Sequence, residues 1–375
     1  MNDFKIPITK VLEVKDHPNA HSLSFITVYG FQVIATKNKY KVGDLILYAP
    51  IDSILPQELE DKLFPVESKV KLHSHRVRQI KIRGAVSQGM LIDLGDIIEF
   101  LDLDKAKNLS EGDDLSLDLN ITKYEPPVAG PSTTLKKGNY RKRNDHPLFH
   151  QYNSVNNIKW FPDIFPNGEE VVITEKIHGT NSRLGLLPFI GDTWYKKLIS
   201  FLGLASKTYR AYGSNRVEIS ASSNYKGYYD KDLYGETFKK IKAFDKVRLG
   251  ETIYGEIYGP GIQKGYEYGL TELNFILFDV KILQPDGKQK WLNPEDVEAY
   301  GKERGFDTVP ILYAGPFNKE IAEKLSKGPS VICSKEKVRE GVVVKARYEY
   351  DEEGNKRAYK LINEEYLNRD NSDNH

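Results

Sequence analysis

The stretch VVITEKIHGTNSRLG, residues 171–185, decides the fold, because a β-branched run is followed directly by polar residues and a glycine. Val and Ile favour strands, and alternate residues of a strand share a face. If residues 171–178 form one strand, Lys176 and His178 point one way and Glu175 points the other. Gly179 then permits a tight turn or a close approach of the backbone to a ligand. The stretch predicts a strand ending in a lysine that is either a solvated edge charge or an amine kept for chemistry.

The bulk composition is that of an ordinary globular protein. The chain has 375 residues, of which 39% are hydrophobic and 29% charged, so two or three domains are expected. No apolar run reaches membrane-spanning length, and MNDFKIPITK lacks a signal-peptide core, so we expect no membrane and a cytoplasmic location. The single cysteine, Cys333, excludes an internal disulfide and a Cys-rich zinc site. A monomer is the default expectation.

The chain divides into three parts by local pattern. Residues 1–125 contain short β-branched or aromatic runs, such as SFITVYG, FQVIATK and DLILYAP, which predict a small barrel of the OB type. Residues 126–145 are rich in Pro, Gly and basic residues and are expected to be a linker. Residues 146–370 form a second, larger domain.

The second domain mixes strands and helices. Strand candidates are EEVVITEKI, LNFILFDVKIL and GVVVKARYEY, and helix candidates are NPEDVEAYGKERG, with an Asn cap and a terminal Gly, and NKEIAEKLSKG. The turn-rich DEEGNK predicts a hairpin between GVVVKARYEY and the strand after it. These patterns predict an α+β fold of antiparallel sheets with flanking helices.

Chemically suggestive residues recur downstream of Lys176. Each alone is a weak signal, but together they form an ordered set. IYGEIYG holds Glu256, FILFDV holds Phe278 and Asp279, EGVVVKARY holds Glu340 and Lys345, and RAYKLINEEYL holds Lys360.

As a set these motifs resemble the covalent nucleotidyltransferase superfamily, which comprises polynucleotide ligases and capping enzymes. The form EKIHGTN is similar to RNA ligases, and a small OB-like module placed first resembles the fifth family of ATP-dependent RNA ligases. HPNAHSLSFITVYG, VGDLILYAPIDSILP and RGAVSQGML resemble that family's N-terminal domain. The resemblance implies an OB-like β-barrel followed by an ATP-grasp-like nucleotidyltransferase domain.

The resemblance also implies a three-step reaction with ATP. A lysine amine attacks the α-phosphate and gives lysyl-AMP, the AMP passes to a 5′-phosphate, and a 3′-hydroxyl then displaces AMP. Lys176 is the candidate nucleophile, and nearby cations together with a bound metal are expected to lower its pKa. Lys345 and Lys360 are the candidate cations, and they are also expected to bind the α-phosphate. Glu256 and Glu340 are hard oxygen donors suited to Mg²⁺ or Mn²⁺ held mainly through water.

Each remaining residue could either bind the nucleotide or have an ordinary structural role. Phe278 stacks on adenine or is a core aromatic residue. Glu175 recognises the adenine edge or pairs with a surface cation. His178 contacts phosphate or is satisfied by backbone. Arg183, expected to share a face with Asn181, grips ribose or phosphate or is solvated. Asp279 is expected to be structural.

Two motifs depart from the family pattern. A basic residue expected in the strand after the lysine loop is matched by Arg216, Lys226 or neither. Relatives often carry Lys-x-Lys in the last motif, where this chain has Ala358 and Lys360, so either Arg357 supplies the second cation or one suffices.

A basic strand at residues 69–83 is expected to track a nucleic-acid backbone by charge, and Arg76 and Arg78 would share one face. Together with Lys81 and Arg83 it predicts a surface for RNA or an RNA/DNA duplex with a nick. Two alternatives stay open: a GTP-using capping-type transferase, and a nucleic-acid-binding protein with an inactive core.

Overall fold

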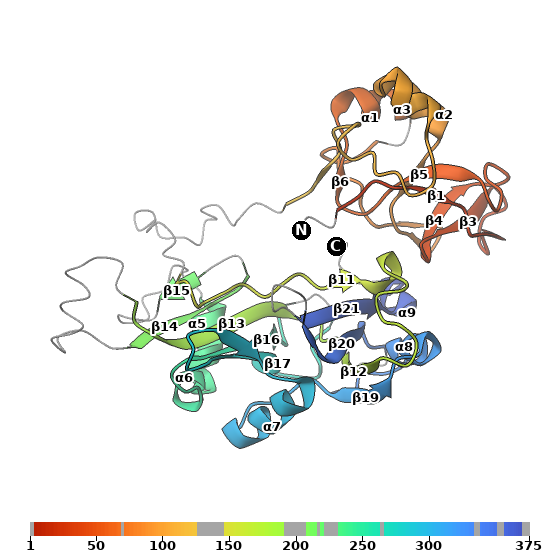
Figure 1. The fold of residues 1–375 in the computed structure, drawn as a ribbon. Coiled ribbons are helices and arrows are strands. Elements are labelled where there is room, and N and C mark those ends of the chain that lie inside the picture. The colour runs from red at the N-terminus through yellow and green to blue at the C-terminus, as the bar shows by residue number, and fades with distance from the viewer. Residues whose placement is uncertain are drawn as a thin grey trace. The chain divides into compact units, whose positions relative to one another are not determined.

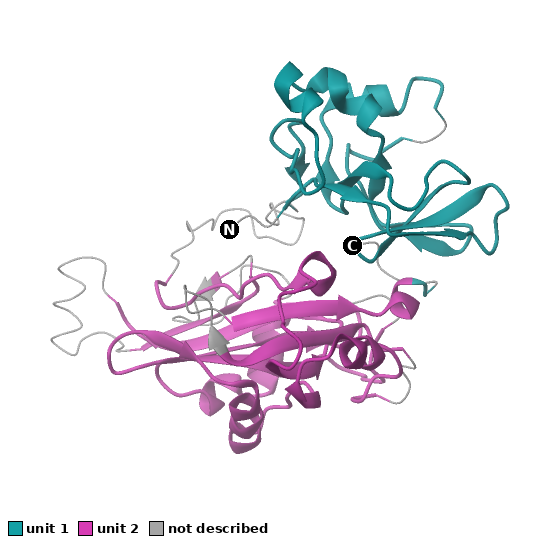
Figure 2. Ribbon diagram, turned by 45° about the vertical axis from the view of Figure 1, so that its right-hand side comes forward, with its two compact units in different colours: residues 1–127, 368–375 teal, residues 128–367 magenta. Residues whose placement is uncertain are grey.

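The computed structural model divides the chain into two compact units (Figure 2). The first unit is Met1–Pro127 with Asn368–His375, and the second unit is Val128–Leu367. The structure describes residues 4–68, 71–125, 146–190, 208–215, 218–220, 232–262, 266–333, 338–350 and 356–369. The expected linker at residues 126–145 lies outside this description.

The first unit is mostly β-structure with short helices to one side. Its strands pair antiparallel as β2-β3-β4, β1-β5-β9, β7-β8 and β10-β6 around an aliphatic core that includes Ile8, Leu47 and Ile92. The elements are β1 (Ile8–Lys10), β2 (Glu13–Asp16), β3 (Leu23–Val28), β4 (Phe31–Thr36), β5 (Leu45–Ala49), β6 (Ser53–Ile54), α1 (Gln57–Leu63), β7 (Ile80–Ile82), β8 (Ala85–Ser87), β9 (Met90–Ile92), α2 (Leu94–Ile97), the 3₁₀ turn Ile98–Phe100, α3 (Leu103–Lys107) and β10 (Thr122–Lys123).

The prediction of one basic strand over residues 69–83 is wrong. Within the described part of this range, 71–83, only Ile80–Ile82 is a strand, and the residues before it are irregular apart from two single bridges at Arg76. The hydrogen bond from the Val77 backbone N–H to Ser53 O explains why no long strand forms. It holds the segment against the Ser53 region, so its backbone groups do not pair in a regular β-ladder.

The second unit contains two antiparallel sheets and five described helices. Its elements are β11 (Asn156–Asn157), the 3₁₀ turn Ile158–Trp160, β12 (Glu170–Glu175), β13 (Thr180–Pro188), β14 (Thr208–Gly213), β15 (Glu218–Ser220), α5 (Leu233–Lys240), α6 (Ala243–Lys246), β16 (Glu251–Tyr258), β17 (Asn274–Leu283), β18 (Gln289–Trp291), α7 (Pro294–Arg304), β19 (Ile311–Pro316), α8 (Lys319–Ser326), β20 (Gly341–Tyr350), β21 (Lys356–Ile362) and α9 (Glu364–Leu367). Figure 1 shows these strands and helices in order from green to blue. The α+β prediction is confirmed.

The five-stranded sheet has the order β11-β21-β20-β12-β19, with only β11 parallel to its neighbour. One face carries Val171, Ile173 and Val344, which pack with Phe165 and α8 in an apolar cluster. The alternate residues of the same strands lie on the other face, and these include Lys345 and Lys360. The period of the strands therefore places both lysines on the face turned away from this core.

The six-stranded sheet has the order β15-β14-β13-β16-β17-β18. Leu184, Ile253 and Leu277 lie on one face and pack under α5, α6 and α7. Cross-strand partners on the other face are Asn181 with Glu256, and Arg183 with Tyr254. Since each sheet buries one face under helices, the polar residues of both sheets lie on the two remaining faces.

Several elements match their sequence predictions. α7 has Asn293 at its N-cap and left-handed Gly305 at its C-cap, and in α8 the Asn318 side chain accepts from two backbone N–H groups. β20 and β21 pair antiparallel as the hairpin prediction requires, although the turn at residues 351–355 lies outside the described residues. The prediction of one strand over 171–178 is wrong at its end, because β12 stops at Glu175.

Candidate functional site

Lys176 is the first residue after β12, and its side chain lies in the interior of the second unit. Its backbone N–H donates to Gly341 O at 3.0 Å, which fixes it beside the start of β20. Its Nζ lies 2.7 Å from Glu340 Oε1, and its side chain retains 24% exposure while that of Glu340 retains 9%. The lysine is therefore not a solvated edge charge, since it forms a largely desolvated ion pair that can still be reached from solvent.

Two carboxylates surround this amine and differ in protonation. Burial raises the pKa of Glu256 to about 8, although the charge of Lys176 opposes the shift. Burial also disfavours the Glu340 anion, but Lys176 and His178 outweigh it and lower the pKa of Glu340 to about 2. One carboxylate is thus ionised at neutral pH while the other retains its proton.

The groups around Lys176 that the structure describes raise its pKa rather than lower it. Burial favours the neutral amine, but the charges of Glu340 and Glu256 outweigh burial and raise the pKa of Lys176. Lys345, one of the two expected cations, donates instead to Asp279 Oδ2 at 2.9 Å. The contact with Glu340 therefore favours the protonated amine of Lys176.

Glu256 lies against the loop that carries Lys176. A Cβ placed on Gly179 would lie 2.6 Å from Ile257 O and 3.0 Å from the Glu256 Cβ, so only glycine allows this approach. Oε2 atoms of Glu256 and Glu340 are buried and accept no hydrogen bond from the described residues. Carboxylate oxygens of this kind, once Glu256 has lost its proton, fit a hard divalent cation, Mg²⁺ or Mn²⁺.

The described residues hold no group of three or more His, Cys, Asp or Glu side chains that could bind a metal ion. A cation at Glu256 and Glu340 would therefore need water or substrate oxygens to complete its coordination, as Mg²⁺ commonly does.

Glu175 and Asn181 present buried acceptors near the same loop. Glu175 is 1% exposed, and its Oε2 accepts from the Val331 backbone N–H at 2.8 Å. Glu175 Oε1 and Asn181 Oδ1 are buried and have no hydrogen-bond partner among the described residues. An acceptor in this condition is costly unless a ligand donor satisfies it. The interpretation of Glu175 as a surface ion-pair partner is wrong, because the residue is buried.

His178 lies in a cluster of tyrosines rather than at an open edge. Its backbone N–H donates to the Tyr268 hydroxyl at 2.7 Å, and its ring packs edge-on against Tyr266 and Tyr366. Its Nδ1 lies 3.6 Å from Glu340 Oε2, and its side chain is 4% exposed. The geometry places His178 behind Glu340, with the carboxylate between it and Lys176.

Arg183 is buried, so the interpretation of it as a solvated arginine is wrong. The residue is 1% exposed, and its guanidinium lies 4.2 Å from the centre of the Phe149 ring. It also donates to Phe149 O at 2.5 Å and to Ser214 O at 3.2 Å. These bonds tie the segment before β11 to the six-stranded sheet.

Asp279 joins the two sheets, as its expected structural role requires. It is fully buried and accepts from Lys345 at 2.9 Å, from Lys356 at 2.6 Å and from the Tyr152 hydroxyl at 2.7 Å. Although burial disfavours its charge, the two lysines lower the pKa of Asp279. Phe278, beside it at a bulge of β17, packs edge-on against Tyr152 and lies 5.7 Å from Lys345 Nζ.

In the last motif, on β21, strand alternation decides which basic residues share a face with Lys360. Lys360 pairs with Val343 across β20 and shares its face with Ala358 and Lys356. Arg357 points to the other face, where it binds Glu169 and packs over Phe165. Arg357 is therefore not placed to supply the missing cation, whereas Lys356 is on the correct face. Arg216 and Lys226 lie outside the described residues.

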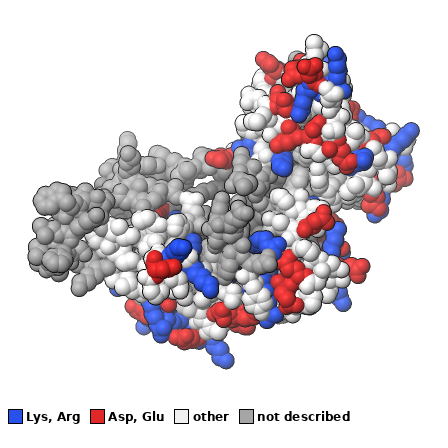
Figure 3. Space-filling view, viewed as in Figure 1, with Lys and Arg blue, Asp and Glu red and all other residues white. Residues whose placement is uncertain are grey.

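The basic residues of the first unit divide into buried and exposed members. Arg76 is largely buried, because it pairs with Asp52 and stacks 3.8 Å from the centre of the Tyr124 ring. Arg78, Lys81 and Arg83 are exposed, and Arg83 lies in the β7–β8 turn. In the view of Figure 3 acidic side chains are interspersed with basic ones over this unit.

Sequence reasoning missed Tyr152, Lys356 and the tyrosines around His178. Lys356 was detectable, because it lies two residues before Ala358 and so shares its strand face. Tyr152 had no such signal, since it lies outside regular structure and reaches Asp279 across a sequence separation of 127 residues.

Comparisons with known proteins follow the same division of the chain. The family described as RNA ligase matches residues 169–362, and one described as an OB-fold domain matches residues 6–94. A search of curated protein sequences gives no match. No described helix is long and apolar enough to cross a membrane.

Solved structures of an RNA ligase from Naegleria gruberi are similar over nearly the whole chain. The form with pyrophosphate has 21% identity and a TM-score of 0.65, covering 96% of this chain and 97% of the other. A lysine-to-alanine mutant with ATP and Mn has 20% identity and a TM-score of 0.65, covering 97% and 98%. A lysine-to-methionine mutant with AMP and Mn has 20% identity and a TM-score of 0.64, covering 96% and 97%. At these identities the likeness establishes the fold.

Proposed function

Because this chain belongs to the RNA ligase family and its activity is the joining of RNA, we propose that it seals a 3′-hydroxyl to a 5′-phosphate with ATP, through lysyl-AMP on Lys176. The observation that carries the proposal is the ion pair of Lys176 Nζ with Glu340 Oε1 at 2.7 Å, beside Glu256. A largely desolvated lysine that can still be reached from solvent is placed for covalent catalysis on a phosphate once it has lost its proton. The Naegleria ligase forms with ATP, AMP and pyrophosphate support the choice of nucleotide.

In the first step the Lys176 amine attacks the α-phosphorus of ATP, a phosphorus–nitrogen bond forms, and pyrophosphate leaves. The amine must first lose its proton, because Glu340 holds it charged in the ligand-free protein. Engagement of the Glu340 carboxylate elsewhere would remove the main attraction for that proton. Glu256 and Glu340 would hold Mg²⁺ or Mn²⁺, which when bound would offset the negative charge of the phosphates.

In the later steps AMP passes to the 5′-phosphate of the polynucleotide, and the 3′-hydroxyl then displaces AMP and closes the strand. Lys360, on the same sheet face as Lys345, would stabilise charge on the transferred phosphate. The position of Lys345 against Asp279 and Phe278 favours a role in holding the site's shape.

The adenine would bind between Phe278 and Glu175. Glu175 Oε1 is a buried acceptor with no partner among the described residues, and it is suited to an exocyclic amine. Asn181 would bind the ribose through its unsatisfied Oδ1. We assign Arg183 and His178 to positioning roles rather than to direct nucleotide contact. Arg183 binds the backbone of Phe149, and His178 lies against Glu340.

The proposed polynucleotide is RNA, or an RNA/DNA duplex with a nick, bound by one copy of the chain. Arg78, Lys81 and Arg83 are exposed in the first unit and suited to phosphate contacts, while Arg76 would act through its support of Tyr124. We propose domain limits of 1–125 and 146–370, with 126–145 as the linker.

A sealing assay on nicked duplexes tests the proposal. Each terminus at the nick is made ribose or deoxyribose in turn, and ATP or GTP is supplied with Mg²⁺. We expect sealing with ATP of at least one ribose-containing nick. Sealing that requires GTP would favour a capping-type enzyme, and binding without any joining would favour an inactive core.

A further inference from the structure

A buried cluster of Asp279, Lys345, Lys356 and Tyr152 carries more positive than negative charge. Asp279 is 0% exposed, and the side chains of Lys345 and Lys356 are 3% and 5% exposed. One carboxylate therefore faces two ammonium groups, while Tyr152 contributes a neutral hydroxyl. Burial of an uncompensated charge is costly, so such a cluster favours a bound anion or the loss of a proton.

Within the part of the chain that the structure describes, the surroundings do not supply the missing negative charge. Lys281, on the same strand as Asp279, adds a further cation, which lies 4.9 Å from the centre of the Trp291 ring. Asp296 acts on Lys356 only weakly, as the smallest of the influences on that lysine. Burial lowers the pKa of Lys356 despite its contact with Asp279, as expected for a cation without sufficient counter-charge.

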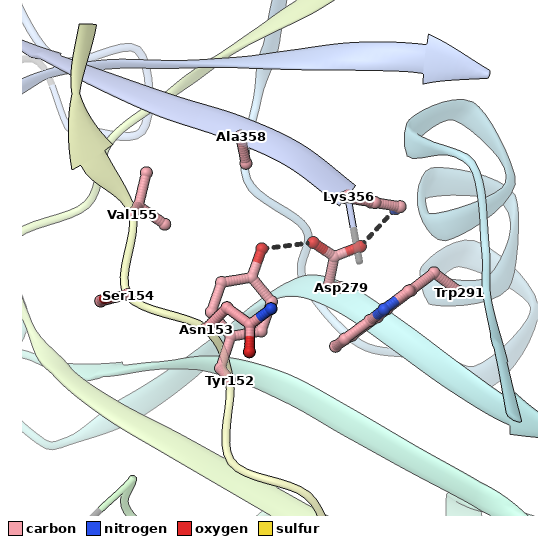
Figure 4. A pocket seen from close by; sticks show the side chains of 8 residues that line it. All are labelled: Tyr152, Asn153, Ser154, Val155, Asp279, Trp291, Lys356 and Ala358. Carbon is pink, nitrogen blue, oxygen red and sulfur yellow. Dashed lines mark hydrogen bonds and ion pairs between the residues drawn. The ribbon is translucent and has the colours of Figure 1, made fainter. Parts of the chain in front are cut away.

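A pocket opens directly beside the excess charge (Figure 4). Figure 4 shows Tyr152 and Lys356 reaching Asp279 from different elements, with Ala358 on the same strand as Lys356. The lining residues are Tyr152, Asn153, Ser154, Val155, Asp279, Trp291, Lys356 and Ala358. The short Ala358 side chain lines the pocket and leaves room that a longer side chain would fill.

We propose that this pocket binds a phosphate group, with Lys356 as the principal contact and Ala358 providing the space. Of the three donors of the Lys356 ammonium, one is directed to Asp279 Oδ1. A phosphate oxygen in the pocket would accept another and balance the charge of the cluster. The site deepens the proposed function, because both substrates of that reaction carry phosphate. The group is either the pyrophosphate portion of ATP or a phosphate of the polynucleotide.

Binding of pyrophosphate and inorganic phosphate to the full-length protein tests the site without any turnover. The dissociation constant is obtained from thermal stabilisation across a concentration series. We expect Lys356→Met to weaken pyrophosphate or phosphate binding roughly tenfold or more, the worth of a charge-assisted hydrogen bond. Ala358→Leu should weaken binding similarly, because it fills the pocket and keeps the charges. Lys319→Met, at a lysine whose side chain is 74% exposed, is the matched control.

The two variants also separate this site from a structural role of Lys356. Lys356→Met leaves Asp279 paired with Lys345, so the protein should fold with nearly unchanged stability in the absence of anions. Equal anion binding by wild type and both variants would overturn the proposal, as would absence of binding to the wild type. These binding results stand even if the protein seals no RNA, which distinguishes failure of the site from failure of the proposed function.

Steady-state sealing identifies which phosphate occupies the pocket. An increase in the KM for ATP in Ala358→Leu, with the KM for nicked RNA unchanged, assigns the pocket to the pyrophosphate portion of ATP. The opposite pattern assigns it to the polynucleotide. Unchanged KM values for both substrates would contradict the site's use in the reaction.

Discussion

Lys176 and Glu340 illustrate how one contact determines chemistry at the residue scale. The carboxylate stabilises the buried ammonium, so in the proposed reaction it would hold the Lys176 amine in its unreactive, protonated form. On this proposal the amine would become reactive when bound substrate engages Glu340. Reactivity is thus coupled to substrate binding rather than built permanently into the lysine.

Replacing each of the two glutamates at Lys176 by glutamine should change the stability of the protein in opposite directions. The pKa of Glu256 is raised from 4.5 to about 8, so its contribution to stability is complete below pH 4.5 and is lost as pH rises toward 8. Glu256→Gln should therefore be more stable than wild type at pH 8–9, with the difference shrinking toward pH 5. Denaturant unfolding across this range measures it, and a wild type that is more stable at pH 9 would contradict the shift.

Glu340→Gln is expected to destabilise the protein at neutral pH by about 3–5 kcal/mol, because it leaves Lys176 buried without its charge partner. The pKa of Glu340 is lowered to about 2, so its stabilisation is present above its ordinary pKa of 4.5 and is lost as pH falls toward 2. The variant and wild type should converge in stability in acid. A constant difference down to pH 2 would be inconsistent with the ion pair.

Gly179 tests the close approach of the lysine loop to Glu256. Gly179→Ala would force a Cβ to 2.6 Å from Ile257 O, a backbone atom that cannot move aside cheaply. We expect a loss of about 1–3 kcal/mol of stability and a larger proportional loss of sealing. Gly95→Ala, where nothing lies within 4 Å of the added Cβ, is the control and should be nearly neutral.

At the residue scale, the sequence could indicate which side chains belong to the candidate site, but not which of them contact one another. The motif order correctly placed Lys176 near Glu256 and Glu340, because the strand ends converge. The direct ion pair of Lys176 with Glu340 had no local signal, since it joins residues 164 positions apart. Strand alternation puts residues 357 and 360 on opposite faces of one strand, so it could have separated Arg357 from Lys360 and revealed Lys356 as well.

At the element scale, Asp279 links β17 of one sheet to β20 and β21 of the other. Asp279→Asn should cost about 3–5 kcal/mol of unfolding free energy, because two buried lysines lose their counter-charge. Asp16→Asn, which breaks the exposed Lys37 pair, should cost less than about 1 kcal/mol. Similar losses in the two variants would show that the link between the sheets contributes little.

Elements with strong local signals were predictable, whereas elements set by distant partners were not. α7 and α8 have Asn at their N-caps, and β20 has three consecutive valines after its first residue, so these elements follow from local chemistry. The segment 71–83 has alternating residues but is held by bonds to Ser53 and Asp52 from another part of the unit. Such competition from tertiary contacts is invisible in a local pattern.

At the scale of the whole molecule, each unit has its own apolar core. A fragment spanning residues 146–370 should therefore fold alone and accept AMP on Lys176, since the site lies within the second unit. Its sealing of nicked RNA should fall by at least an order of magnitude, because the exposed cations of the first unit are absent. Equal sealing by the fragment and the full chain would refute a role for the first unit in RNA binding.

The central claim is that the amine of residue 176 becomes bonded to phosphorus. Incubation of the full chain with ATP and Mg²⁺, followed by peptide mapping with mass spectrometry, tests it directly. The account predicts one AMP on Lys176, absent from Lys176→Ala and retained in Lys319→Ala. An adduct on another residue, or an adduct that persists in Lys176→Ala, would contradict it.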